Sequence, residues 1–294
     1  MAQEKKTVII DSQILTTFSR CEREFDFRFL QILEPTSKEE NLEVGSLMHI
    51  MLKIYYCLKR SGKFTHNECR NLAVEIAGVH AVKTEVEITY TEELSEHFKL
   101  YADHYQYESW IPLNVEEPFT FVLYEDDDIR ILYFGVMDLY IENFGQRYPV
   151  DHKTERRTSD PLELDNQFLG YCAATGSKVL YVNKIGLQKS KKVEERFRRV
   201  PLSYTQNRID EWKSVSIFRA RQYLHALEEH AFPPRYTGCL RFNKKCRYYD
   251  LCNTDSGEAR DWKAKSTFQK GKEWNPYTRD DELDKVIAEV IGSK

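Results

Sequence analysis

A block of short strand-like runs in the middle of the chain limits the possible fold more than any other feature. The runs cover residues 119–124, 129–134, 136–141 and 148–150, and they are rich in β-branched and aromatic residues, which favour extended backbone. Acidic residues at 125–128 and the segment Asn143-Phe144-Gly145 separate them and are typical of turns. The pattern predicts an antiparallel meander.

Helical patterns flank this meander. Asp11 or Ser12 is expected to cap a helix that carries Cys21. Further helices are expected at about 44–57, 162–175 and 204–230, with another strand at 179–187. This order predicts an α/β fold around one mixed sheet. We expect one domain with a mainly helical first part, a sheet core, a cysteine-rich segment and a polar tail, over residues 1–111, 112–232, 233–256 and 257–294.

Composition restricts the function classes. With 41% hydrophobic residues, the 294-residue chain can bury a substantial core. Its 43 Lys and Arg against 47 Asp and Glu leave a net charge of −4, which excludes a polycation that binds phosphate chains indiscriminately. No apolar run is long enough to cross a bilayer and no secretory signal is evident, so a cytoplasmic protein without membrane contact is expected.

Two acids and a lysine fall inside the strand-like runs. Asp138 interrupts the apolar run 135–141, and a buried acid there needs a cation. Asp151 and Lys153 lie two apart on the next strand, so they share a face while His152 points away. Neighbouring strands are about 4.8 Å apart, so Asp138 can share that face. The pattern predicts two carboxylates and an ammonium group that converge.

Such a set suits hydrolysis of a phosphodiester. Carboxylates hold Mg²⁺ or Mn²⁺, which activates water, while a lysine positions the nucleophile or neutralises charge. The alternative is an ordinary salt bridge on a sheet face, because an acid two residues before a lysine is a common arrangement.

Three motifs in this order resemble a known family. GxxD ends at Asp138, VDHKT contains Asp151 and Lys153, and QxxxY spans Gln167 and Tyr171. Together they resemble the PD-(D/E)XK nuclease superfamily, in particular its RecB and AddB-like branch. The resemblance implies a restriction-endonuclease-like core, with a central mixed sheet flanked by helices, an amino-terminal helical region and a carboxy-terminal cysteine cluster.

The resemblance also implies roles for individual residues. Asp138 and Asp151 would be metal ligands and Lys153 the catalytic lysine, while Gln167 and Tyr171 would line the substrate groove. His49, which ends a GxxxH motif, would be a further metal ligand. The family also places an acid before the first strand of the sheet, here Glu116 or Glu117, with a slight preference for Glu116.

Three cysteines, Cys239-x6-Cys246-x5-Cys252, lie close enough to hold one metal centre, which the distant Cys21 could complete. Four thiolates suit an iron–sulfur cluster or zinc, and the alternative is buried or free thiols. A subset of the branch, including CRISPR-associated spacer-acquisition nucleases, holds a [4Fe-4S] cluster with one cysteine before the nuclease motifs and three after. The x6 interval is longer than the usual x2, so zinc stays an alternative.

The resulting functional hypothesis is a metal-dependent DNA nuclease. By analogy with the branch, we expect an exonuclease of DNA repair or recombination that acts on single-stranded DNA or free ends. Arg156, beside the catalytic strand, is expected to contact phosphates, as is a basic run at 184–199. The chain lacks a helicase motif, so a helicase or recombination partner would unwind duplexes. The alternative is a catalytically inactive subunit that binds nucleic acid and whose fold is held together by a metal centre.

Overall fold

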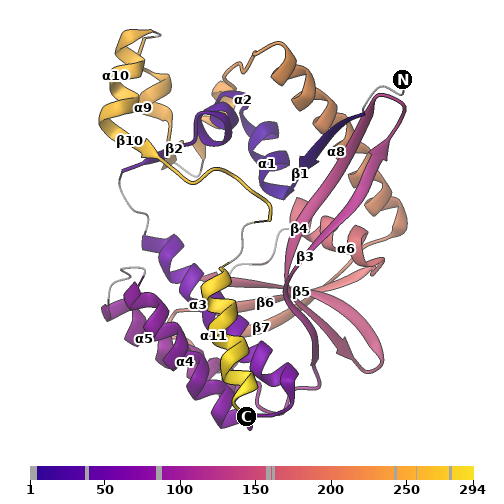
Figure 1. Ribbon diagram of the computed structural model, residues 1–294, viewed down its shortest axis with the longest axis vertical. Coiled ribbons are helices and arrows are strands. Elements are labelled where there is room, and N and C mark those ends of the chain that lie inside the picture. The colour runs from indigo at the N-terminus through magenta and orange to yellow at the C-terminus, as the bar shows by residue number, and fades with distance from the viewer. Residues whose placement is uncertain are drawn as a thin grey trace. The chain divides into compact units, whose positions relative to one another are not determined.

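The structure is a computed structural model that describes residues 5–36, 40–83, 88–156, 160, 163–241, 244–255, 257–277 and 280–294 (Figure 1). Its contacts divide the chain into two compact units. The first unit comprises Met1–Lys38, Thr120–Gly135 and Asp210–Tyr277. The second unit comprises Glu39–Phe119, Val136–Ile209 and Thr278–Lys294. Strands β3 (Ile111–Glu125) and β4 (Ile129–Asn143) and helix α8 (Gln206–Glu228) have residues in both.

The first unit contains short helices and strands from both ends of the chain. Its helical elements are α1 (Ser12–Arg20), α2 (Glu22–Phe25), the π-helix η1 (Asp26–Leu30), the 3-10 helix η2 (Tyr236–Gly238), α9 (Tyr249–Cys252) and α10 (Glu258–Thr267). Its remaining strands are β1 (Lys6–Ile10), β2 (Leu33–Pro35), β8 (Leu240–Arg241), β9 (Lys244–Lys245) and β10 (Phe268–Lys270). β1 pairs in parallel with the first part of β4, and β10 pairs antiparallel with β2.

The first helix forms with the expected cap, but it ends at Arg20, so that Cys21 lies in extended backbone between α1 and α2 rather than on the helix. Asp11 accepts a hydrogen bond from the Ile14 N–H at 2.7 Å, which satisfies a backbone donor at the helix start. Ile14 and Phe18 are buried, and the Phe18 ring packs edge-on against Tyr223 of α8. Cys21 therefore follows a helix that is anchored in the core of the first unit.

The second unit holds the longer helices and most of the sheet. Its helices are α3 (Glu40–Ser61), α4 (His66–Lys83), α5 (Ile88–His104), α6 (Asn166–Thr175), α7 (Val193–Arg196) and α11 (Asp281–Gly292). Its remaining strands are β5 (Gln146–Glu155), β6 (Val179–Gly186) and β7 (Phe197–Ser203). β5 pairs antiparallel with β4 and parallel with β6, and β6 pairs antiparallel with β7. This mixed sheet confirms the predicted α/β class.

Helices cover the sheet of the second unit on both faces. Successive residues of β5 point to opposite faces: the His152 ring stacks on Tyr56 of α3, whereas Lys153 bonds to Gln167 of α6. Helix α3 is the centre of the hydrophobic core, and its Met48 and Met51 are fully buried. The sheet therefore has α3 on one side and α6 on the other.

Several element boundaries differ from expectation. β4 continues through Gly135, where the sequence pattern predicts two separate runs, and the pattern predicts neither β1 nor β7. Helix α6 ends as predicted at Thr175 and is followed by the cap Gly176, with φ 70°, but it begins at Asn166 behind the cap Asp165. The expected start of this helix, residue 162, lies outside the described residues. Residues 257–294, expected as a polar tail, contain α10, β10 and α11.

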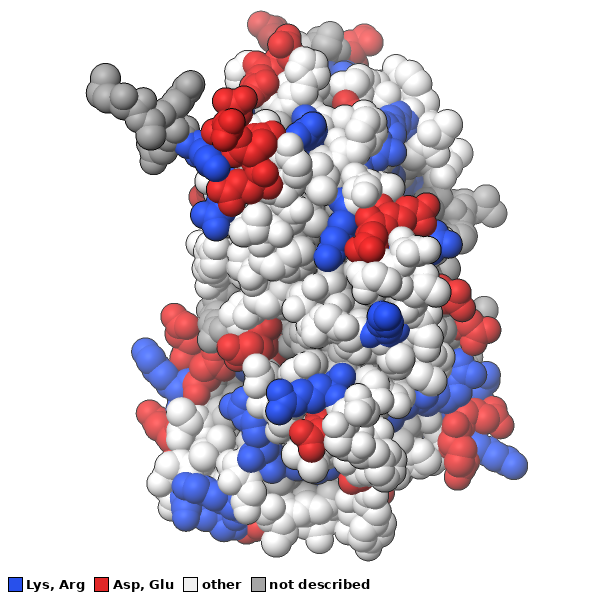
Figure 2. Space-filling view, turned by 90° about the vertical axis from the view of Figure 1, so that its right-hand side faces the viewer, with Lys and Arg blue, Asp and Glu red and all other residues white. Residues whose placement is uncertain are grey.

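Basic and acidic side chains are interspersed on the surface. On the face in Figure 2, lysine and arginine side chains form small groups among acidic and uncharged ones. This mixture agrees with the near balance of 43 basic and 47 acidic residues. None of the helices in the described ranges combines the length and apolarity that a bilayer span requires.

Candidate active site

The pairing of β4 with β5 positions the two predicted carboxylates. Leu139 pairs with Val150, and one further step of this antiparallel register would place Asp138 opposite Asp151. Asp138 Oδ2 accepts a hydrogen bond from the backbone N–H of His152 at 2.7 Å. Asp138 is 8% exposed and Asp151 is fully buried. The two strands thus hold two acids in a place that excludes most water.

His49, Glu116 and Asp138 form the candidate metal-binding triad. Each offers one ligand atom, and these atoms lie within 4.8 Å of one another. His49 Nδ1 lies 3.8 Å from Asp138 Oδ2. An imidazole and two carboxylates are suitable ligands for a divalent cation. Asp151 is not a member of this close group within the described chain; its nearest ion pair is with Lys153.

Backbone conformation and burial distinguish Glu116 from the neighbouring Glu117. Glu116 has φ 48°, a left-handed conformation that residues with a side chain rarely adopt. Strained backbone of this kind is concentrated at functional sites. Glu116 is partly buried within the triad, whereas Glu117 is exposed. The structure therefore places Glu116 beside His49 and Asp138, and its assignment as a ligand stays a prediction.

Lys153 joins Asp151 to α6. Its Nζ lies 2.8 Å from Asp151 Oδ2 and donates to Gln167 Oε1 at 3.0 Å. Gln167 Nε2 in turn donates to the Tyr171 hydroxyl at 2.8 Å, which donates to the Val136 carbonyl of β4 at 2.7 Å. Tyr171 is 2% exposed, so this placement favours support of Lys153 over direct contact with substrate.

Burial and like charge perturb the acids of the site. Burial, with the neighbouring Asp138 carboxylate, raises the pKa of Glu116 to about 8. Burial also raises the pKa of Asp151 to about 7, although Lys153 opposes the rise. Burial lowers the pKa of Lys153, but the charge and hydrogen bond of Asp151 together with the charges of Asp138 and Asp165 outweigh it, and the net pKa is raised. The positive charge near Glu116 and Asp151 is therefore too small to keep both carboxyls ionised at neutral pH. Lys153, in contrast, stays protonated.

His152 lies on the opposite face from Lys153 and begins a buried polar network. Its Nδ1 accepts a hydrogen bond from Asn183 Nδ2 at 2.8 Å, and Asn183 also donates to the Tyr101 hydroxyl. Burial lowers the pKa of His152 well below its ordinary value, so the ring is neutral. No local sequence pattern predicts this network, because its members come from β5, β6 and α5.

Arg156 follows β5 and is exposed. It lines a cavity of about 450 Å³. The other lining residues come from α3, α5 and the segment after β6, namely Val44, Glu93, Leu94, His97, Leu187 and Gln188. The basic run at 184–199 is different. Lys184 is fully buried and pairs with Glu155, and Arg199 pairs with Glu108, so these two do not form an exposed phosphate-binding surface.

The four predicted cluster cysteines all belong to the first unit and form no disulfide. Gly238, next to Cys239, comes so close to Arg20, next to Cys21, that an added Cβ would lie 3.1 Å from the Arg20 carbonyl oxygen. The Arg235 N–H donates to Cys21 Sγ at 3.4 Å. This approach brings the segment with Cys239 to the end of α1.

The other two cysteines lie beside the same small core. Cys246 and Cys252 pack against buried Phe27, Tyr248 and Leu251. Burial raises the pKa of both thiols, to about 11 for Cys246, and the charges of Cys21 and Cys239 add to the rise at Cys252. The charges of Cys21 and Cys239 therefore reach Cys252, and the charge of Cys252 reaches Cys246. In the described chain no three of these sulfur atoms form a close ligand group like that of His49, Glu116 and Asp138.

Comparison with known proteins identifies the family. Residues 13–253 match the PD-(D/E)XK nuclease superfamily. The chain belongs to this superfamily, and the mixed sheet flanked by helices is its restriction-endonuclease-like core. Membership implies a metal-dependent nuclease that acts on DNA. No match is found among curated proteins.

Proposed function

We propose that this chain hydrolyses DNA phosphodiesters at the centre formed by Asp138, Asp151 and Lys153. The main support for this proposal is the triad of His49, Glu116 and Asp138, which lies next to the Asp151–Lys153 ion pair. Two carboxyls with raised pKa values, the partly buried Glu116 and the fully buried Asp151, mark a place that attracts a cation. His49, Glu116, Asp138 and Asp151 are the proposed ligands of Mg²⁺ or Mn²⁺.

Each residue of the centre has a proposed task. When bound, the cation polarises the scissile phosphate and lowers the pKa of water. Lys153 holds the attacking water or a phosphoryl oxygen through its ammonium group, which Asp151 and Gln167 orient at 2.8 and 3.0 Å. Tyr171 fixes Gln167. Because these contacts exist before substrate arrives, little reorganisation is needed during the reaction.

The proposed substrate is DNA that is single-stranded or has free ends. Arg156 at the rim of its cavity would contact a phosphate next to the scissile one, and the apolar wall of Val44, Leu94 and Leu187 would accept a nucleobase. This arrangement suits an unpaired strand, because its bases are free to rotate and pack against these apolar side chains. We propose exonucleolytic action, with a helicase or recombination partner for duplex substrates.

Digestion of end-labelled DNA tests the activity. Single- and double-stranded substrates are incubated with Mg²⁺ or Mn²⁺, with wild-type protein and with Asp138→Asn. We expect metal-dependent loss of the single strand by the wild type, and loss of about 10²–10³-fold in rate for the variant. Circular single strands separate the modes, because an exonuclease leaves them intact. Wild-type protein that binds DNA without cutting it would support an inactive binding subunit instead.

We further propose that Cys21, Cys239, Cys246 and Cys252 hold a [4Fe-4S] cluster. Four free thiols, one at the end of α1 and three in the segment 239–252, supply the ligand set. Burial raises the thiol pKa of Cys246 and Cys252, so their thiolates need a metal centre to balance the charge. The cluster would link α1 to the segment 239–252 and stabilise the first unit. Anaerobically purified protein should contain iron and sulfide, whereas stoichiometric zinc in a colourless protein would reject the cluster.

A further inference from the structure

Helix α11 packs on the second unit although it follows the part of the chain that matches the family. The match ends at residue 253, and α11 spans Asp281–Gly292. Leu283 and Ile287, one turn apart, are buried in the core of the second unit. Figure 1 shows α11 in yellow alongside α3, which it contacts. The helix is therefore an additional element next to the one that carries His49.

Polar contacts fix the position of α11. Glu282 pairs with Lys83, and the Ile291 carbonyl accepts a hydrogen bond from Lys63 at 2.8 Å. Asp284 pairs with Lys53 at 2.6 Å, and the Lys53 side chain is 14% exposed while the Asp284 side chain is 39% exposed. An exposed ion pair contributes little to the free energy of folding. Removing one partner of a pair that is shielded from water has a larger effect, because the other charge is left uncompensated.

The Lys53–Asp284 pair lies beside the proposed metal site. Lys53 follows His49 by four residues on α3, so both side chains project from the same face of this helix. The charges of Lys53 and Asp284 both reach the Glu116 carboxyl, and each acts on it more strongly than the charge of Asp151 does. Both charges of the pair therefore act on a proposed ligand.

We propose that Asp284 neutralises Lys53, and that this counter-charge from α11 strengthens the binding of a divalent cation by the His49–Glu116–Asp138 triad. An unpaired ammonium group one helical turn from a ligand would repel a divalent ion. Asp284 prevents this repulsion while Lys53 stays in place for an incoming phosphate. The inference rests on the proposed function, because it concerns the same metal site.

Titration of the full-length protein with Mn²⁺ at low salt, followed by calorimetry, tests the proposal. Asp284→Asn should weaken Mn²⁺ binding about tenfold. Lys53→Met breaks the same contact but removes the positive charge, so it should bind Mn²⁺ at least as tightly as the wild type. The double variant Lys53→Met/Asp284→Asn should return to within about threefold of the wild type.

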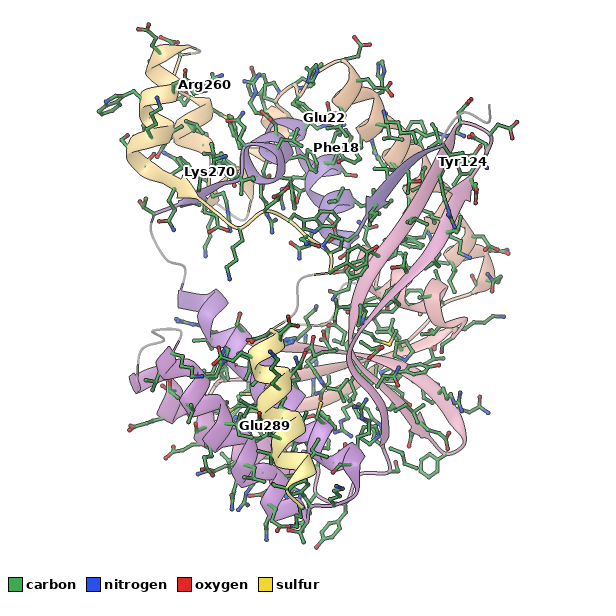
Figure 3. All side chains as sticks on the ribbon, viewed as in Figure 1. Phe18, Glu22, Tyr124, Arg260, Lys270 and Glu289 are labelled. Atoms are coloured by element: carbon green, nitrogen blue, oxygen red, sulfur yellow. The ribbon has the colours of Figure 1, made fainter. Side chains whose placement is uncertain are left out.

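Glu289→Gln is the matched control, since Glu289 is an exposed acid on the same helix (Figure 3). It should leave the Mn²⁺ affinity unchanged. Equal weakening by Asp284→Asn and Lys53→Met would overturn the proposal, because the contact would then be structural alone. Unchanged affinity in Asp284→Asn would also overturn it. If Asp138→Asn binds Mn²⁺ like the wild type, the proposed metal site itself fails, and this inference with it.

Discussion

The backbone N–H of His152 donates a hydrogen bond to Asp138 Oδ2 at 2.7 Å. This bond ties the carboxylate of one strand to the residue between Asp151 and Lys153 on the next. The position of Asp138 is therefore set by main chain, which moves less than a side chain does. One carboxylate oxygen has a fixed partner, and the group is aimed towards His49 and Glu116.

The link between Lys153 and α6 leads to the first prediction. Gln167→Leu removes the acceptor of the Lys153 ammonium group and should lower the DNA cleavage rate about 10–100-fold, with little effect on folding. Single-turnover cleavage measures the effect. Gln188→Leu, at the wall of the Arg156 cavity, is the comparison variant and should change affinity for DNA more than the rate. Equal rates for Gln167→Leu and wild type would show that Gln167 does not orient Lys153.

The two neighbouring glutamates give a second prediction. Glu116→Gln should weaken Mn²⁺ binding about 10–100-fold because it removes one charged ligand of the triad. Glu117→Gln is a matched control, because its side chain is exposed on the same strand. Calorimetric titration distinguishes the two. A larger effect of Glu117→Gln would show that the wrong acid has been assigned.

The raised pKa values predict how metal binding depends on pH. Glu116, with a pKa of about 8, and Asp151, with a pKa of about 7, retain protons that a cation must displace. Mn²⁺ affinity should therefore rise between about pH 6 and pH 8.5 and then level off.

The metal-free protein should show the opposite trend in stability. Folding raises the pKa of both acids, so stability is lost as the pH rises from their ordinary values towards about 7 and 8. Thermal unfolding with and without Mn²⁺ measures both trends. A Mn²⁺-induced increase in unfolding temperature that does not depend on pH would contradict the assignment of these acids as ligands.

The cysteine proposal predicts a selective loss of iron. Cys21→Ser should lose the cluster and destabilise the first unit, since it removes the ligand supplied by the end of α1. Cys172→Ser is the control because Cys172 is a buried cysteine of α6 in the second unit. Iron and sulfide analysis after anaerobic purification measures the result. Full iron content in Cys21→Ser would show that Cys21 is not a ligand.

Local patterns predict much of this fold. The Asp11 cap, the end of α6 at Gly176 and the alternation at Asp151, His152 and Lys153 depend on neighbours in sequence, and all three occur in the structure. The same patterns miss β1 and β7. Each is short and its sequence contains Lys, Arg or Pro, so it becomes a strand only through pairing with β4 or β6.

The site is predictable in part for the same reason. Motifs identify Asp138, Asp151 and Lys153, but not their distances. The inward turn of Glu116 depends on a left-handed backbone that no local pattern indicates. Lys53 and Asp284 are 231 residues apart and meet only because α11 packs on α3. Tertiary packing also buries Lys184 and leaves the Arg199 side chain only 12% exposed, although the basic run predicts phosphate contact.

Anomalous diffraction from crystals grown with Mn²⁺ tests the proposed metal centre most directly. We expect a manganese peak coordinated by His49, Glu116 and Asp138, with the Asp151 carboxylate turned to the same ion. A peak elsewhere, with these four side chains unliganded at a saturating Mn²⁺ concentration, would contradict the assignment.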